Sequence, residues 1–464
     1  MQPISISKLQ VDIQIPDWII WIQCIAFIVL YAVWGIPETM GFRNTALITG
    51  AALSLYSIYR FRHFFIQVNA IPIWLVALLF IWATLHLFMF SQDYSLQLLE
   101  FRRIWRYAAI AVIFAIGLGL SLASASANQG RWWALIYFGL CSPVLIYLLK
   151  YTLTTYEVQL GIQVPASLKI YFYSQPHYVP KSDYIAFCLP TLGIALGRMK
   201  STLLNEHFGW RQFYAILIHF SVIAATLFLF YIQDVKNGMF HAAFLFLIFG
   251  AFIFFSKTST VNFWRNAVIF LAALGIFTTA LYPHVKKNNS WRTLVADIKV
   301  AVQLDKHQEW KYAGAKGYPN NEFGKVVSAT NYERTAWFLV GSKLALESPL
   351  GYGLIEDSFK KMAKAKWPEV SPNLSHSHSG WLDFILAKGF PGFLLIMGAL
   401  LIAMRNSKYM DPPWKGVASW GLLANLLLWC TTEVTATVTF VTLLFWIMLA
   451  SSLVIWHSPD LVDS

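Results

Sequence analysis

Residues 71–90 read IPIWLVALLFIWATLHLFMF, a stretch without Asp, Glu, Lys or Arg. An α-helix of about 20 apolar residues crosses the hydrocarbon core of a bilayer. Similar stretches recur along the chain, which is 57% hydrophobic, 17% aromatic and only 12% charged, with a mean hydropathy of +0.55. Water-soluble domains do not have this composition. The sequence therefore predicts an all-α, polytopic membrane helical bundle.

The apolar stretches predict about twelve transmembrane helices. A transmembrane β-barrel would instead show shorter segments of alternating hydrophobicity. The residues before the first stretch lack the features of a removable signal peptide, so we expect that stretch to remain as an anchor. The expected spans are residues 18–36, 45–59, 71–90, 107–124, 132–150, 183–197, 212–231, 239–256, 265–282, 381–404, 416–430 and 434–456.

An even number of spans places both termini on one side of the membrane. If that side is cytoplasmic, every inner loop carries Lys or Arg, as the positive-inside rule requires. The model then has nine spans in residues 1–282, a large outer loop domain in residues 283–380, and three spans with a short cytoplasmic tail in residues 381–464. The working site is expected in the outer loop domain, where the chain concentrates its polar residues.

Two short outer segments, residues 100–106 and 234–238, are unexpectedly basic. Guanidinium groups bind phosphate oxygens bidentately, so an anionic lipid headgroup or a pyrophosphate is a candidate ligand. The alternative is that the arginines reach towards the interface or pair with Glu100, and that the lysine pairs with Asp234. The cations concerned are Arg102, Arg103, Arg106 and Lys236.

The outer loop domain shows two helix-like patterns. Residues 291–310 predict an amphipathic helix, and residues 332–347 predict a second helix that ends at the Pro and Gly residues of 348–353. The Gly-x-Gly there follows a helix rather than a strand, which argues against dinucleotide binding. Arg334 lies in the first turn of the second helix and is a candidate anion ligand. Alternatively, Arg334 forms an ion pair with Glu333 or with another carboxylate of the loop.

Two histidines, His376 and His378, precede the tenth span within the stretch NLSHSHSGWLD, residues 373–383. No third ligand stands at a spacing typical of a metal site, so metal binding is not expected. An imidazole at the outer mouth of a membrane cavity suits general acid/base chemistry or hydrogen bonding to phosphate. Alternatively, Ser377 or Ser379 caps the helix and the histidines have no chemical role.

The stretches YERTAWFLVGSKLALESPLGYGL, residues 332–354, and HSHSGWLDFILAKGFPG, residues 376–392, resemble the signature region of the bacterial O-antigen ligase superfamily. This superfamily joins O-antigen ligases, O-antigen polymerases and protein O-oligosaccharyltransferases. The general layout of spans and outer loop is also similar, and the chain looks most like an O-antigen ligase.

The resemblance implies a glycosyltransferase that takes its glycan from an undecaprenyl-pyrophosphate donor, without metal, nucleotide sugar or other cofactor. As an O-antigen ligase, the chain would use lipid A core as its acceptor, at the periplasmic face of the bacterial inner membrane. Arg334 would hold the pyrophosphate and His378 would lie at the catalytic centre, with His376 outside the motif. Lys236 stands where many members carry an arginine, so the second phosphate contact is Lys236 or one of the three outer arginines.

This chemistry needs fixed positive charge at the departing pyrophosphate and a base for the acceptor hydroxyl, and in-line displacement would invert the anomeric centre. Arg334, Lys236 and the outer arginines supply the charge, and His378 is the favoured base. Membrane lipids are the other expected partners, whereas the net charge of +12 reflects topology rather than nucleic-acid binding. The rival bases are the outer carboxylates Glu100, Asp234, Glu333 and Glu433.

Three alternatives remain from the sequence. A pilin O-oligosaccharyltransferase or an O-antigen polymerase would use the same donor with another acceptor, and the short segment after the last span favours the ligase. A lipid-linked sugar transporter would place ionisable residues near the membrane midplane. The spans contain little of this kind beyond His86, His219 and His241, which argues against transport.

Overall fold

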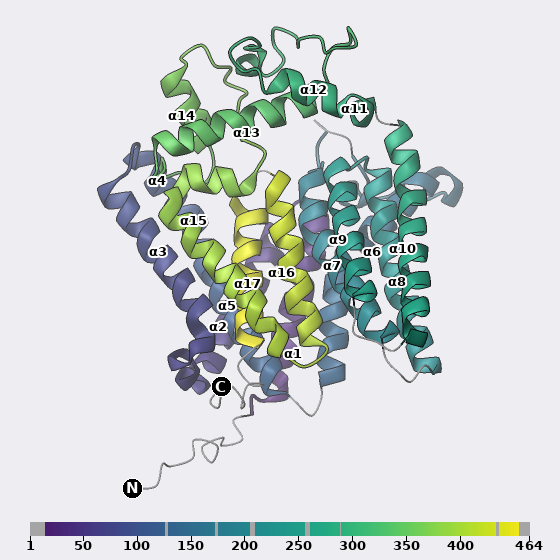
Figure 1. Ribbon diagram of the computed structural model, residues 1–464. Coiled ribbons are helices and arrows are strands. Elements are labelled where there is room, and N and C mark those ends of the chain that lie inside the picture. Colours follow the sequence, from purple (N-terminus) through teal and green to yellow (C-terminus); the bar gives the residue numbers. More distant parts are fainter. Residues whose placement is uncertain are drawn as a thin grey trace.

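The computed structural model describes residues 14–125, 129–171, 175–204, 209–255, 260–287, 289–432 and 436–453. Within these residues the structure is all-α, and its β-pairing is limited to one isolated bridge between Asn320 and Val326. Long helices form a bundle, and a group of shorter helices lies across one end of it (Figure 1). We call that end of the bundle the outer end.

Each predicted span overlaps a helix of the bundle, although residues 434–435 and 454–456 of the last span lie outside the described residues. Seven helical segments are long and apolar enough to cross a membrane. The chain is therefore a multi-pass membrane protein. The bundle helices are α1 (Asp17–Ala32), α2 (Met40–Arg60), α3 (Ile71–Met89), α4 (Tyr94–Glu100), α5 (Arg106–Ser124), α6 (Gln129–Leu160), α7 (Lys181–Leu203), α8 (Trp210–Ile232), α9 (Lys236–Phe254), α10 (Thr260–Lys287), α15 (Gly380–Asn406), α16 (Trp414–Thr431) and α17 (Val441–Leu453).

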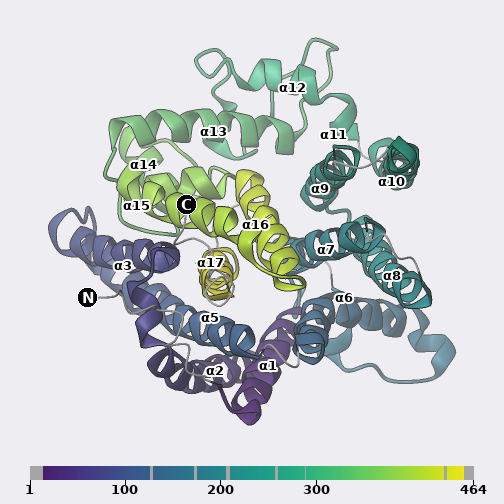
Figure 2. The same cartoon turned by 60° about the horizontal axis from the view of Figure 1, so that its bottom comes forward.

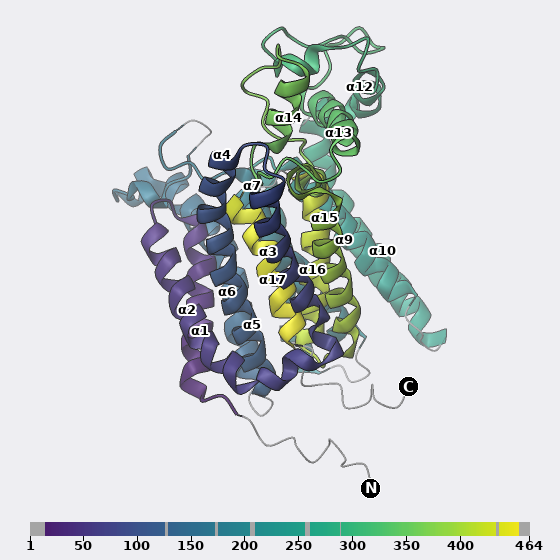
Figure 3. The same ribbon diagram turned by 90° about the vertical axis from the view of Figure 1, so that its left-hand side faces the viewer.

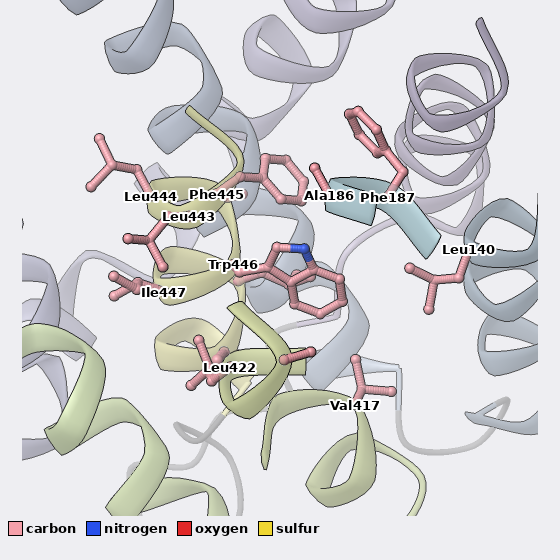
Figure 4. Close-up of a cluster of buried hydrophobic side chains, with 14 of the residues drawn as sticks. Leu140, Ala186, Phe187, Val417, Leu422, Leu443, Leu444, Phe445, Trp446 and Ile447 are labelled. Carbon is pink, nitrogen blue, oxygen red and sulfur yellow. The ribbon is translucent and has the colours of Figure 1, made fainter. Parts of the chain in front are cut away.

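Helix α17 forms the centre of the bundle. All of its residues are buried, and α5, α15 and α16 pack around it (Figure 2). A helix that is apolar on every face has no preferred surface for solvent and is buried by its neighbours. Trp446 fills the space between α17 and the surrounding helices (Figure 4), and a Cβ atom at Gly421 of α16 would lie 2.5 Å from its ring. Gly421 therefore permits the close packing of α16 on α17.

The outer helices are α11 (Asn289–Arg292), α12 (Leu294–Ala301), α13 (Ala329–Glu347) and α14 (Ser358–Lys366). Helix α13 runs across the outer end of the bundle (Figure 1), and the group covers the side of α9 and α15 rather than that of α1 and α2 (Figure 3). Trp310, Trp337 and Phe359 belong to a separate hydrophobic core that Leu382 and Leu386 of α15 complete. This shared core joins the outer helices to the start of α15.

The predicted helix over residues 332–347 is confirmed as α13. The predicted amphipathic helix over residues 291–310 is wrong beyond Ala301, where α12 ends and irregular chain leads to a short 3₁₀ helix, Glu309–Tyr312. Burial explains the difference, since Trp310 turns into the core of the outer group and is only 3% exposed, which a continuous helix on the surface would prevent. Helix α14 was not predicted.

A buried carboxylate, Asp297 of α12, organises the outer group. Its Oδ1 accepts a hydrogen bond from Asn321 Nδ2 at 3.0 Å. Its Oδ2 accepts from Asn331 Nδ2 at 2.9 Å, from Thr293 Oγ1 at 2.8 Å and from the Ser328 backbone N–H at 3.1 Å. The carboxylate thus ties α12 to the loop that precedes α13 and to the first turn of α13. Burial of a charge is tolerated when its oxygens are hydrogen-bonded in this way.

The substitution Asp297→Ala should loosen residues 321–331, because it leaves several buried donors without their acceptor. We expect a loss of local stability on the order of 3 kcal/mol. Hydrogen–deuterium exchange of these backbone amides measures it. The exposed Asp305→Ala is the matched control, and unchanged exchange in Asp297→Ala would contradict the role assigned to this carboxylate.

Candidate functional site

Arg334 links α13 to the bundle. Its Nη1 donates a hydrogen bond to Asn237 Oδ1 at 2.5 Å, and Asn237 Nδ2 donates to the Thr431 carbonyl oxygen at 3.1 Å. One turn along α9, His241 Nε2 lies 2.9 Å from the Leu427 carbonyl oxygen. The guanidinium is therefore held where α9, α13 and α16 meet at the outer end. Asn237 was not predicted as a site residue, although it adjoins the basic position 236.

Lys236 lies beside Arg334, and their charges interact. Its Nζ donates a hydrogen bond to Ser290 Oγ, and its charge also interacts with that of Asp234. Lys181 at the start of α7 contributes a further positive charge to these surroundings. The structure therefore brings together two of the predicted phosphate-binding residues, Arg334 and Lys236.

His378 lies against the same helix. Its imidazole stacks on the indole of Trp337, with ring centroids 5.3 Å apart and ring planes 14° apart. Trp337 follows Arg334 by three residues, so the two side chains project from neighbouring positions on the surface of α13. The backbone of His378 is left-handed, with φ of 59°, which costs a non-glycine residue about 1 kcal/mol. The surrounding structure thus imposes this conformation.

Asp383 holds the turn that carries the two histidines. Its Oδ1 accepts a hydrogen bond from the Ser377 backbone N–H at 2.8 Å, and its Oδ2 lies 4.0 Å from His376 Nδ1. Asp383 is buried and belongs to the first turn of α15. The expected cap is not formed by a side chain, because Ser379 occupies the N-cap position without a side-chain capping bond. The two histidines therefore have different partners, Asp383 for His376 and Trp337 for His378.

Glu333 adds a carboxyl group near His378. Tyr318 donates a hydrogen bond from its hydroxyl to Glu333 Oε1 at 2.7 Å. Burial raises the pKa of the Glu333 carboxyl, while the Tyr318 bond and the charge of His378 oppose that increase. Glu333 is thus a rival proton acceptor beside the imidazole. Glu433, another predicted rival, lies outside the described residues.

The three outer arginines form a separate group. Arg102, Arg103 and Arg106 are exposed on and just after a π-helical turn, Phe101–Trp105, between α4 and α5. Arg103 pairs with the carboxylate of Glu356. Helices α4 and α9 lie on opposite sides of the outer end (Figure 1), so the structure does not bring these arginines to Arg334 and Lys236.

Glu100 is buried and hydrogen-bonded to backbone. Its Oε1 accepts from the Ile355 N–H at 2.6 Å and its Oε2 accepts from the Glu356 N–H at 3.0 Å. Lys388 of α15, fully buried, interacts electrostatically with Glu100 and donates a hydrogen bond from Nζ to the Gly353 carbonyl oxygen. The expectation that the spans contain little ionisable beyond three histidines is therefore wrong. The sequence signal for a buried charge of this kind is a single lysine within an apolar span.

These charges lie at a break in α15. Gly389 has φ of 67°, and Pro391 has no backbone N–H to donate. The turn that follows α13 fills the break: the N–H groups of Tyr352 and Gly353 donate to the carbonyl oxygens of residues 386 and 387, each at 2.8 Å. In return, the residue 390 N–H donates to the carbonyl oxygen of Pro349 at 2.9 Å. The two stretches that carry the family resemblance thus fit directly into each other.

The substitutions Glu100→Gln and Lys388→Met test this buried pair. Each single variant should lose about 3–5 kcal/mol of stability, because it leaves one uncompensated charge in an apolar environment. The double variant should recover much of that loss, since it buries no charge. Thermal unfolding in detergent measures all three. A double variant as unstable as the sum of the two single variants would show that the charges do not compensate each other.

Comparison of the chain with models of protein families gives no match, and neither does comparison with curated protein sequences.

Proposed function

We propose that this protein is a lipid-linked oligosaccharide glycosyltransferase of the O-antigen ligase type. In this proposal it moves an O-antigen glycan from undecaprenyl pyrophosphate to a sugar hydroxyl of lipid A core. The observation that carries the proposal is the arrangement on α13, where Arg334 is fixed by Asn237 beside Lys236, and His378 stacks one turn further along on Trp337. This arrangement places cations and an imidazole next to the membrane-spanning bundle.

The cations suit the leaving group. Glycan transfer breaks the bond between the anomeric carbon and the pyrophosphate oxygen, and the electron pair leaves with the pyrophosphate. Preorganised positive charge is most effective where negative charge develops in this way. Arg334 is held in place by its hydrogen bond to Asn237, so little rearrangement is needed when the pyrophosphate departs. The proposed mechanism uses no metal ion and no nucleotide sugar.

The imidazole suits the acceptor. His378 takes the proton of the acceptor hydroxyl as its oxygen forms the bond to the anomeric carbon from the face opposite the pyrophosphate, which inverts that centre. Stacking on Trp337 fixes the plane of the imidazole ring. The secondary candidates for the base are Glu333, whose charge interacts with that of His378, the His376–Asp383 pair, and Asp234 beside Lys236.

The proposed topology has about twelve transmembrane helices, with the helices α2, α7, α10, α16 and α17 added to the seven candidate segments. The outer helices α11–α14 then form a periplasmic loop domain between spans nine and ten, and the protein lies in the bacterial inner membrane. This places the α13 site at the membrane surface, where a donor with a lipid tail in the bilayer presents its pyrophosphate.

A lipid-linked sugar transporter is the second candidate, and the broken helix α15 with its buried Lys388 is the feature that favours it. In transporters such breaks expose backbone groups to the substrate. Here the turn 349–353 occupies the break and Lys388 donates to Gly353. Because the turn fills the break, its backbone groups are not open to a substrate. This favours a structural role for the break, and therefore a transferase over a transporter.

The test is transfer of a purified undecaprenyl-pyrophosphate glycan to lipid A core, and separately to a pilin, without added metal. We expect Arg334→Met and His378→Asn to lower the rate by about 100-fold or more. Asn tolerates a left-handed backbone, so His378→Asn keeps the turn and removes the imidazole. Lys343→Gln, on an exposed position of α13, and His307→Asn in the preceding loop are the controls and should retain wild-type rates.

The outcomes separate the candidates. Glycosylated lipid A core supports the ligase, whereas glycosylated pilin or an elongated lipid-linked glycan supports an oligosaccharyltransferase or a polymerase with the same site. Movement of intact donor across vesicles, without transfer, supports the transporter. Undiminished transfer by Arg334→Met and His378→Asn would remove the α13 site from the mechanism.

A further inference from the structure

A cavity of about 510 Å³ lies beside Lys236, among α9, α11 and the loop before α13. Three of its lining residues are cationic, three carry hydroxyl groups, and none of the described residues that line it is acidic. The lining residues are Lys236, Ser290, Arg292, Thr293, Phe323, Lys325, Val326 and Ser328. The described lining is therefore basic, and Phe323 and Val326 add apolar surface to it.

The walls of the cavity are held by hydrogen bonds. Asp297, behind the wall, accepts from Thr293 and from the Ser328 backbone. Ser290 accepts from Lys236 Nζ at its hydroxyl and from Asn331 Nδ2 at its carbonyl oxygen, the latter at 2.7 Å. These contacts join α9, α12 and α13 around the cavity. Its shape is thus largely preformed, as is usual for small-molecule sites.

The cavity continues from the proposed pyrophosphate site, because Lys236 belongs to both. Ser328 directly precedes α13, whose amino-terminal end adds partial positive charge. A donor with its pyrophosphate at Arg334 and Lys236 extends its lipid tail into the bilayer and its sugars away from it. The cavity lies among loops of the outer group and is in position for those sugars.

Size and lining point to charged sugars. A volume of about 510 Å³ lies within the usual range of small-molecule sites and exceeds what one pyrophosphate group fills. Phe323 and Val326, 64% and 62% exposed, offer apolar surface for the faces of sugar rings. Hydroxyl groups of the lining can bond to sugar hydroxyls, and Arg292 and Lys325 are suited to carboxylates.

We propose that this cavity binds acidic sugars, so that the glycan carried by the donor has negatively charged residues close to its pyrophosphate. The identity of that glycan as the donor rests on the proposed function, whereas binding of an acidic oligosaccharide in the cavity does not. Arg292 and Lys325 are the residues that discriminate charged from neutral glycans, because the pyrophosphate site does not need them.

The test measures binding by calorimetry, with the full-length protein in nanodiscs of zwitterionic lipid. The probes are trigalacturonate, its trimethyl ester and inorganic pyrophosphate. The ester keeps the sugar rings and removes the charge, and we expect it to bind at least about tenfold more weakly than trigalacturonate. The double variant Arg292→Gln/Lys325→Gln should lose affinity for trigalacturonate by a similar factor, and the exposed Lys306→Gln control should not.

Equal binding of trigalacturonate and its ester, or unchanged trigalacturonate binding in the double variant, would overturn the proposal. A third outcome would also overturn it: trigalacturonate does not bind, and the affinity for pyrophosphate falls in the double variant. The cavity would then be a phosphate site. The binding test does not require glycan transfer. If trigalacturonate binding depends on Arg292 and Lys325 but the protein is inactive as a transferase, the proposed function is wrong and the acidic-sugar site is still supported.

Discussion

The break in α15 at Gly389 is the constraint on which the rest of the outer structure depends. A membrane helix cannot leave backbone groups unsatisfied, because lipid offers no hydrogen bonds. The turn at residues 349–353 supplies the missing partners, and a Cβ atom at Gly389 would lie 2.4 Å from the Pro349 carbonyl oxygen, so the fit requires glycine. Because this turn follows α13 directly, filling the break also fixes the carboxyl-terminal end of α13 on the bundle. Near its other end, α13 is fixed by the hydrogen bond from Arg334 to Asn237.

Buried charges reinforce these attachments. Glu100 accepts from two consecutive backbone N–H groups just beyond the turn, and Lys388 bonds to a carbonyl oxygen within it. Asp297 performs a similar task in the outer group, where it holds α12 and the first turn of α13 together. Each charge is costly to bury, and each is compensated by several donors, an acceptor or an opposite charge. The site residues on α13 are therefore presented by a helix that is held at both ends.

Hydropathy predicted the helices of the bundle other than α4, because apolar length is a local property of the sequence. It also predicted α13, whose Pro and Gly stop is local too. The amphipathic pattern after α12 wrongly predicted a continued helix, because Trp310 is instead buried in the hydrophobic core of the outer helices. Contacts between residues far apart in the chain could not be predicted from local sequence patterns. No local pattern indicates that Arg334 contacts Asn237, 97 positions earlier, or that the arginines at 102–106 lie away from Arg334. Glu100 and Lys388, 288 positions apart, are a further case. Their proximity was not predicted, although Lys388 stands out as a lysine in the apolar span 381–404.

The outer end therefore carries two basic zones, one at Arg334 and Lys236 and one at the exposed arginines between α4 and α5. We propose that the first zone holds the pyrophosphate of the donor. The most direct measurement is a cryo-electron microscopy structure of the protein in nanodiscs with undecaprenyl pyrophosphate. We expect pyrophosphate density within hydrogen-bonding distance of the Arg334 guanidinium and the Lys236 ammonium group. Density at Arg102, Arg103 and Arg106, with the surroundings of Arg334 empty, would contradict it.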